Sequence, residues 1–367
     1  MSAYAIVLVL LCFVLWWGTQ VVYKDGMLRI RGILRLLGTG LLVCDKPVIF
    51  VPGIKESMLT DSFGRVLWLK LASCFKKTDP LIFREGETTN TVGVLDRLTF
   101  FPILLEYKPC FRFMRRLALG KNGYVFGYDW RDYPDAIASR LGELVNRVIE
   151  ETGEKPSLVA HSFGGLIAHS VAKEQPEKID KLVYVSVPFR PGVNFFKDIH
   201  KGRKVGLNKD ILSKEAIFSH PSSFALVPQR GSGNWSGKEL MDAKTWEENK
   251  WSVFADREVD LVAFQERLNR IGDFYSLIQA PKDIQNRTLI ITGSHIKTLT
   301  KIGESGEEIY EDGDARVGED GALPFDHLPN MEHLSMAVRH DLQLNNKKIV
   351  ESILFFLNQH YGDEGIV

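Results

Sequence analysis

Short apolar runs alternate with amphipathic stretches along residues 45–367. Apolar, β-branched runs bounded by Pro, Gly or charged residues predict strands, and apolar positions at helical spacing predict helices. The predicted strands cover residues 48–51, 124–126, 158–160, 181–187 and 287–292. The predicted helices cover residues 135–151, 164–173 and 346–360. Strands that alternate with helices in this way are typical of a parallel sheet covered on both faces.

Two long insertions interrupt this pattern. About 95 residues, from 191 to about 283, separate two predicted strands, which is far more than a usual connection between a helix and a strand. That insertion contains apolar helical fragments and three tryptophans, and a second insertion covers residues 61–101. We therefore predict one α/β domain over residues 47–367, with a cap at about 191–283 over its site.

The first 23 residues are almost entirely apolar, which is long enough to span a bilayer. Neither Lys nor Arg precedes the run and no small-residue cleavage site follows it, so it favours an uncleaved single-pass anchor over a signal peptide. The positive charges that follow the run predict a cytosolic body, and a lumenal body stays an alternative. Residues 24–46 fit an amphipathic segment in the membrane interface or the first strand or helix of the body.

Charge and cysteine content narrow the function. Lys plus Arg and Asp plus Glu both number 46, and no basic patch is interleaved with aromatic residues, so nothing indicates a nucleic-acid partner. The four cysteines form no Cys-x-x-Cys pair, so no zinc or redox motif is present. A Cys74–Cys110 disulfide is compatible with the sequence but is not indicated by it.

The stretch from Leu158 to Gly165 resembles a nucleophile elbow, in which a serine lies on a tight turn between a strand and a helix. Such a turn needs small residues two positions before and after the serine, and Ala160 and Gly164 occupy those positions around Ser162. The alternative is a chance serine in a strand–helix turn. The elbow predicts Ser162 as a nucleophile.

In an α/β-hydrolase the nucleophile is followed along the chain by an acid and then a histidine. The acid is expected on the loop after the strand at 287–292, and the histidine before the last helix. Position alone does not choose among the candidates. The acids are Asp312, Asp314, Asp320 and Asp326, and the histidines are His327, His333 and His340.

Several further motifs together resemble the lecithin–cholesterol acyltransferase family, which includes phospholipid:diacylglycerol acyltransferases. The matching segments are residues 47–54 (first strand and oxyanion loop), 66–69 (a tryptophan segment), 127–131 (Gly-Tyr-Asp-Trp-Arg), 160–165 (elbow), 221–228 (cap), 310–314 (acid loop) and 333–336 (histidine segment). The sequence departs from the family pattern at residues 55–57, where Lys-Glu-Ser replaces Leu-Gly-Ser or Leu-Gly-Asn, and at residues 315–317, where Ala-Arg-Val replaces small residues, often Gly-Thr-Val.

The resemblance implies roles for particular residues. Ser162 is expected to be the nucleophile, Asp314 the acid and His333 the base. The backbone N–H groups of Phe163 and Lys55 are expected to form the oxyanion hole. Trp68, in the tryptophan segment, is expected to contact substrate.

The resulting hypothesis is a membrane-anchored α/β-hydrolase that takes a fatty acyl group from a phospholipid onto Ser162. It would pass the group to a lipid alcohol, as an acyltransferase, or to water, as a phospholipase A. This chemistry needs neither a metal nor an organic cofactor. An esterase or lipase for neutral or smaller esters is the first alternative, and a non-catalytic lipid-binding protein on the same fold is the second.

Overall fold

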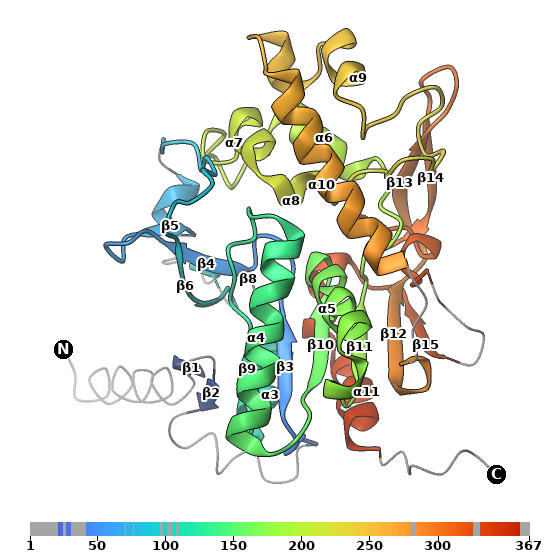
Figure 1. Ribbon diagram of the computed structural model, residues 1–367. Helices are drawn as coiled ribbons and strands as arrows, with labels where there is room; N and C mark the ends of the chain where they lie inside the picture. Colours follow the sequence, from blue (N-terminus) through green and yellow to red (C-terminus); the bar gives the residue numbers. More distant parts are fainter. Residues whose placement is uncertain are drawn as a thin grey trace, which may run out of the picture.

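An eight-stranded sheet forms the centre of the protein, in the order β1-β2-β9-β3-β10-β11-β12-β15 (Figure 1). The computed structural model describes residues 21–24, 27–30, 42–69, 71–75, 77–95, 98–100, 105–107, 110–279, 284–325 and 331–359. The strands are β1 (Val21–Lys24), β2 (Met27–Ile30), β9 (Gly123–Val125), β3 (Val48–Val51), β10 (Ser157–His161), β11 (Leu182–Val185), β12 (Thr288–Gly293) and β15 (Glu332–Met336). The strands from β9 to β15 are parallel, and β1 and β2 join one edge in antiparallel pairing. The predicted parallel sheet is therefore confirmed.

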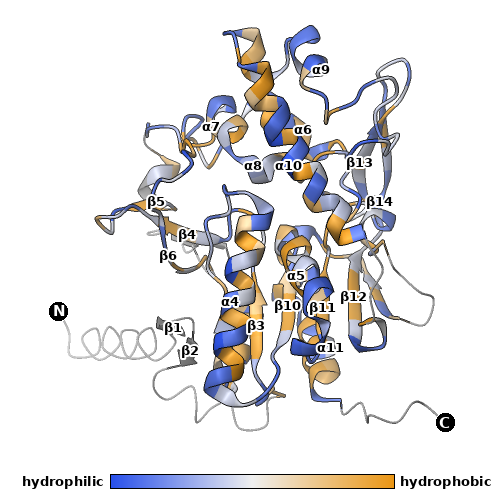
Figure 2. Ribbon diagram, viewed as in Figure 1, coloured by the Kyte–Doolittle hydropathy of each residue, from blue (hydrophilic) through white to orange (hydrophobic). Residues whose placement is uncertain are grey.

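Helices cover both faces of this sheet, because successive side chains of each strand point to opposite faces. Ile49 and Val51 of β3 belong to the apolar cluster that includes helices α4 (Pro134–Thr152) and α5 (Phe163–Glu174). Val48 and Phe50 belong to a second cluster with α3 (Phe111–Leu119) and α11 (Lys347–Asn358). Figure 2 shows the central strands β3 and β10 mainly in the colour of hydrophobic residues, as expected for a covered parallel sheet.

The long insertion between β11 and β12 forms a set of helices beyond the carboxyl ends of the strands (Figure 1). The helices are α6 (Asn194–Lys201), α7 (Lys214–Ser219), α8 (Pro221–Phe224), α9 (Ala243–Glu248) and α10 (Leu261–Gln279). Phe196 of α6 packs against all three tryptophans of the insertion, with ring centroids 4.8 Å from Trp235, 5.4 Å from Trp246 and 4.7 Å from Trp251. These aromatic contacts hold the insertion together as a unit above the sheet.

Smaller sheets complete the body. Strands β4 (Ser57–Thr60), β5 (Val66–Trp68) and β6 (Asn90–Val94) form a three-stranded sheet after β3, and β7 (Leu98–Phe100) pairs with β8 (Leu105–Tyr107). A hairpin of β13 (Ile296–Ile302) and β14 (Glu308–Gly313) follows β12. Cys44, Cys74 and Cys110 are free and buried, so the Cys74–Cys110 disulfide does not form.

The predicted membrane anchor at residues 1–23 lies outside the described residues, except for its last three residues. Those three belong to β1, which pairs with β2 at the edge of the sheet. Within the described ranges, no helix combines the length and apolar character needed to cross a membrane. Part of the segment predicted at 24–46 is the strand Met27–Ile30, which agrees with the alternative of a first strand of the body.

Candidate active site

Ser162 lies on the turn between β10 and α5, as the elbow motif predicts. Its backbone adopts φ 52° and ψ −130°, a strained conformation for a residue with a side chain. A Cβ atom on Gly164 would lie 2.3 Å from the carbonyl oxygen of Pro52 and 2.5 Å from that of Val51. Only glycine therefore allows the start of α5 to pack against the end of β3, which brings the loop after β3 alongside the serine.

His340 and Asp314 complete a hydrogen-bonded chain with Ser162. His340 Nε2 lies 2.8 Å from Ser162 Oγ, and His340 Nδ1 lies 2.7 Å from Asp314 Oδ2. His340 is the first residue of the 3-10 helix His340–Asn345, and its backbone N–H donates to the Asp314 carbonyl at 3.0 Å. The ring is thus fixed between a hydroxyl and a carboxylate, the arrangement of a nucleophile, a base and an orienting acid.

Asp314 is fully buried and held by several donors. Its Oδ1 accepts the backbone N–H groups of Arg316 at 2.9 Å and Val317 at 2.8 Å, and Gln343 Nε2 donates to Oδ2 at 3.3 Å. A Cβ atom on Gly293, the last residue of β12, would lie 2.2 Å from Asp314 Cβ, so this glycine makes room for the acid. Burial tends to raise the pKa of Asp314, but His340 and the hydrogen bonds outweigh burial and lower it. The carboxylate is therefore kept charged beside the imidazole.

His333 is not in this chain, and its predicted role as the base is corrected by the geometry. It lies within the edge strand β15, opposite Ile290 in the middle of β12, and its Nε2 is 2.9 Å from Thr292 Oγ1. Catalytic groups of a parallel sheet lie beyond the carboxyl ends of its strands, whereas His333 is the second residue of its strand. His340, which follows that carboxyl end, takes its place.

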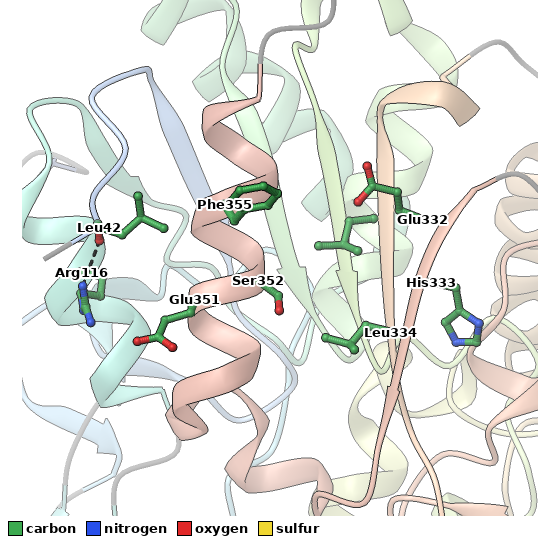
Figure 3. A pocket seen from close by; sticks show the side chains of 9 residues that line it. Leu42, Arg116, Glu332, His333, Leu334, Glu351, Ser352 and Phe355 are labelled. Carbon is green, nitrogen blue, oxygen red and sulfur yellow. Dashed lines mark hydrogen bonds between the residues drawn. The ribbon is translucent and has the colours of Figure 1, made fainter. Parts of the chain in front are cut away.

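A separate groove of about 820 Å³ lies beside His333, between β15 and α11 (Figure 3). Figure 3 shows Leu42, Arg116 and Phe355 along the same groove, and the Ser162 side chain is not part of its lining.

The two other acid candidates that the structure describes do not reach the serine. Asp312 is exposed, and its carboxylate lies 3.6 Å from His295 Nδ1. Asp320 is exposed at the start of a short 3-10 helix. Asp326 and His327 lie outside the described residues.

The loop after β3 passes beside Ser162 and carries Lys55 and Glu56. Lys55 has φ 69°, which marks a tight turn at this point. Glu56 Oε2 accepts the backbone N–H of Gly53 at 2.5 Å and so fastens the turn from within. Trp68 Nε1 donates to the Lys55 carbonyl at 2.8 Å from outside it. Phe163, the other predicted oxyanion residue, is the first residue of α5.

A buried ion pair that the sequence reasoning missed lies directly beside the triad. His161, the residue before the nucleophile, places Nδ1 2.8 Å from Glu56 Oε1, and its Nε2 donates to the His340 carbonyl at 3.2 Å. Burial tends to lower the pKa of His161, but the charge and hydrogen bond of Glu56 raise it by more. Burial tends to raise the pKa of Glu56, and His161 lowers it by more. No local sequence pattern reveals this pair, because the two residues are 105 positions apart and meet only through the parallel pairing of β3 and β10.

The Tyr-Asp-Trp-Arg segment supports the same loop rather than entering the chemistry. Tyr128 Oη donates to the Pro52 carbonyl at 2.6 Å, and Trp130 Nε1 donates to the Ser57 carbonyl at 3.2 Å. Arg131 is buried and makes two hydrogen bonds to the Asp129 carboxylate, at 2.9 and 2.7 Å. The segment therefore holds the loop after β3 from both ends.

A cavity of about 510 Å³ opens onto Ser162 and His340. Trp68 lines it, buried and edge-on to Trp130 with ring centroids 5.4 Å apart. Further apolar side chains line the cavity, including those of Leu69, Leu95, Phe195 and Leu212. Its volume suits a ligand the size of a drug or a short acyl ester.

Comparisons with known proteins agree with this arrangement at the level of fold. The chain aligned in the Tle4–Tli4 complex covers 85% of this chain and 98% of its own length, with a TM-score of 0.55 and 12% identity. That likeness, the parallel sheet and the serine elbow followed by Asp314 and His340 decide the fold. The chain has an α/β-hydrolase fold.

Sequence relatives match only parts of this chain. An uncharacterized protein of Saccharomyces cerevisiae is 35% identical over 124 residues, which are 33% of this chain and 19% of the relative. Epoxide hydrolase 1 of Caenorhabditis elegans is 39% identical over 79 residues, 20% of this chain and 19% of the relative. The matches thus span about a fifth of the length of each relative. No family model matches the chain, so the lecithin–cholesterol acyltransferase family stays a resemblance of motifs.

Proposed function

We propose that this α/β-hydrolase is a serine enzyme that transfers acyl groups from carboxylic esters. Ser162 is the nucleophile, His340 the base and Asp314 the acid. The observation that carries the proposal is the unbroken chain of hydrogen bonds from Ser162 Oγ through His340 to Asp314, at an elbow that opens onto a cavity.

In the first half-reaction, Ser162 Oγ attacks the ester carbonyl and His340 Nε2 accepts the hydroxyl proton. The backbone N–H groups of Phe163 and Lys55 stabilise the oxyanion of the tetrahedral intermediate, each by about 3–4 kcal/mol on the scale of other hydrolases. The intermediate then expels the alcohol, which takes the proton from His340, and the acyl group stays on Ser162. Asp314 keeps the imidazole oriented and stabilises its positive charge.

In the second half-reaction, an acceptor hydroxyl gives its proton to His340 and attacks the acyl-enzyme. The bond from the acyl carbon to Ser162 Oγ then breaks, and Oγ takes the proton back from His340. Water as acceptor yields a carboxylic acid, and a lipid alcohol yields a new ester. The apolar side of the cavity, with Trp68 and Leu69, favours a fatty acyl chain over a polar one. The motif resemblance and the apolar run at residues 1–23 support a phospholipid as acyl donor at a membrane. An esterase or lipase for smaller or neutral esters uses the same residues and is the second candidate.

A fluorophosphonate probe tests the serine mechanism directly, because it reacts with an activated serine. We expect wild-type protein to be labelled at Ser162, and Ser162→Ala to lose both the label and ester turnover. His340→Asn should lower turnover by at least roughly 10³-fold, since the base is lost. His333→Asn is the matched control and should retain turnover. Absence of labelling on wild type, or equal losses in the two histidine variants, would contradict the mechanism.

A separate measurement addresses the substrate. The purified protein is incubated with mixed phospholipids, with and without a lipid alcohol, and the products are identified by mass spectrometry. Release of free fatty acid or formation of a new lipid ester supports the lipid proposal. Turnover of short neutral esters with no turnover of any phospholipid favours the esterase candidate.

A further inference from the structure

One side of the cavity is strongly cationic. Five basic side chains line it, from Lys55, Arg203, Lys204, Arg316 and Arg339. They come from four separate parts of the chain: the loop after β3, the segment after α6, the loop that carries Asp314, and the loop before His340. Their convergence on one cavity is a product of the fold.

Three of these cations share a single acidic partner. Asp198 Oδ2 on α6 lies 3.7 Å from Lys55 Nζ, 3.1 Å from Arg203 Nη1 and 3.7 Å from Arg316 Nη2. Asp198 itself does not line the cavity. One carboxylate cannot neutralise three positive charges, so the cavity wall carries an excess of positive charge.

The acidic residues reduce this excess without cancelling it, because the three carboxylates of the lining and Asp198 together number four against five Lys and Arg side chains. Glu56 is paired with His161, Asp314 with His340, and Asp341 with Arg339, whose Nε lies 3.6 Å from Asp341 Oδ1. Lys55 reports this excess of positive charge. Burial, together with the positive charge of Arg203, lowers the pKa of Lys55 to about 8 despite Asp198. A bound anion would relieve that repulsion.

The position of the cluster relative to the triad indicates where such an anion belongs. Arg316 is two residues after Asp314, and Lys55 is two residues after Gly53, whose loop borders Ser162. Guanidinium and ammonium groups bind phosphate and carboxylate through charge-assisted hydrogen bonds. The apolar side chains of the same cavity, including Trp68 and Leu212, are free of charge and suit an acyl chain.

We propose that this cavity selects esters that carry an anionic group, a phosphate or a carboxylate, close to the scissile carbonyl. Lys55, Arg203 and Arg316 bind that group while the acyl chain lies against the apolar side. The inference rests on the proposed ester chemistry at Ser162 and adds its substrate class. The anion can belong to a phospholipid headgroup or to a soluble ester, and both present the same chemistry to the cluster.

Two matched substrate pairs test the inference and separate these sources. The soluble pair is butyryl-glycerophosphate and monobutyrylglycerol, which differ only in the phosphate. The lipid pair is dioleoyl phosphatidate and dioleoylglycerol in micelles of a neutral detergent. In at least one pair, wild type should have the higher kcat/KM for the anionic member. Preference in the lipid pair alone identifies a headgroup, and preference in the soluble pair identifies a soluble ester.

Removing one cationic side chain should reduce the preference of the enzyme for anionic esters over neutral ones. We expect Arg316→Gln to lower the anionic-to-neutral ratio of kcat/KM by about 10- to 100-fold, mainly through KM, because one charged hydrogen-bond donor is lost. Arg316→Lys should restore part of the ratio. Arg203→Gln, on a more exposed side chain, provides a second variant should the first fold poorly. Arg257→Gln, an exposed arginine outside the cavity, is the control and should leave the ratio unchanged.

A purely structural role for the cluster, linking α6 to the loops below it, gives a different result. Both members of each pair would then lose activity equally in Arg316→Gln, and that outcome overturns the proposal. A wild-type enzyme that turns over the neutral esters as well as the anionic ones also overturns it, and leaves the serine mechanism standing. If the fluorophosphonate probe fails to label wild type, that result would instead contradict the proposed ester chemistry at Ser162.

Discussion

Replacing Glu56 with glutamine tests whether the buried pair beside the triad stabilises the fold. Glu56 and His161 have side chains only 15% and 4% exposed, and Glu56 accepts two hydrogen bonds, from His161 and from the Gly53 N–H. The substitution keeps the shape of the side chain and removes its charge. It therefore leaves the packing intact, but only the amide oxygen can accept a hydrogen bond. The Gly53 N–H keeps a neutral acceptor, and the amide NH2 has to donate to a neutral His161 Nδ1 in place of accepting from it.

The expected cost follows from the character of these bonds. A hydrogen bond to a charged group contributes about 1.5–3 kcal/mol and is roughly twice as strong as one between neutral groups. Weakening the bond from Gly53 and replacing the charged bond from His161 by a neutral one should lower the free energy of unfolding by about 1–3 kcal/mol. Against a total stability of about 5–15 kcal/mol, this change is easily measured.

The pH dependence distinguishes an ion pair from a neutral hydrogen bond. The pKa of His161 is raised in the folded state, so its contribution is complete below the unfolded value of about 6.5 and is lost as pH rises through the folded value. The pKa of Glu56 is lowered, so its contribution is present above about 4.3 and is lost as pH falls through the folded value. The difference in unfolding free energy between wild type and Glu56→Gln should therefore be largest between about pH 4.3 and 6.5.

Urea unfolding followed by tryptophan fluorescence, repeated from pH 5 to 8.5, measures this difference. Glu143→Gln, on the exposed face of α4, is the matched control and should not change the unfolding free energy or its pH dependence. If the difference in unfolding free energy between wild type and Glu56→Gln stays constant above pH 6.5, the ion-pair interpretation is refuted. A variant as stable as wild type at pH 6 would refute the stabilising role altogether.

Two further substitutions test the acid and the packing of the last helix. Asp314→Asn should lower ester turnover by at least roughly 10³-fold, because His340 loses its charged acceptor. Asp312→Asn should change ester turnover little. A larger loss in Asp312→Asn than in Asp314→Asn would identify Asp312 as the acid. Lys181 is buried and its Nζ donates to the carbonyls of Phe356 at 2.8 Å and Leu357 at 3.1 Å, at the end of α11. Lys181→Met should therefore lower the urea-unfolding free energy by about 1–3 kcal/mol, and a loss no larger than that of the exposed Lys155→Met would contradict this role.

The central sheet and the elbow could be predicted because their signals are local. The apolar run of β3 is four residues long, and all four of its side chains are buried, so the run alone identifies a covered strand. Gly164 is required by contacts with the loop after β3, but the need for a small residue two positions after the serine is a property of the turn itself. Such requirements can be read from neighbouring residues without knowledge of the fold.

Only the family resemblance narrowed the choice among the candidate acids, because the position of Asp314 depends on a hairpin that the strand pattern does not reveal. Strands β13 and β14 lie between β12 and Asp314, and their pairing returns the chain to the end of the sheet. The Glu56–His161 pair depends in the same way on two turns brought together by the parallel pairing of β3 and β10. Neither residue has a local pattern that identifies its partner 105 positions away.

The choice between His333 and His340 was decided by strand register, and the sequence carried a signal for it. The large apolar residues Leu334, Met336 and Val338 lie at every second position, a period of two that predicts a strand through this segment. A histidine inside a strand of a parallel sheet is held alongside its neighbouring strand, as His333 is beside β12. A general base has to reach the nucleophile beyond the carboxyl ends, so it belongs on the segment that follows the last strand. By that reasoning the alternation itself excludes His333 and leaves His340, at the start of the next helical turn, as the residue able to reach Ser162.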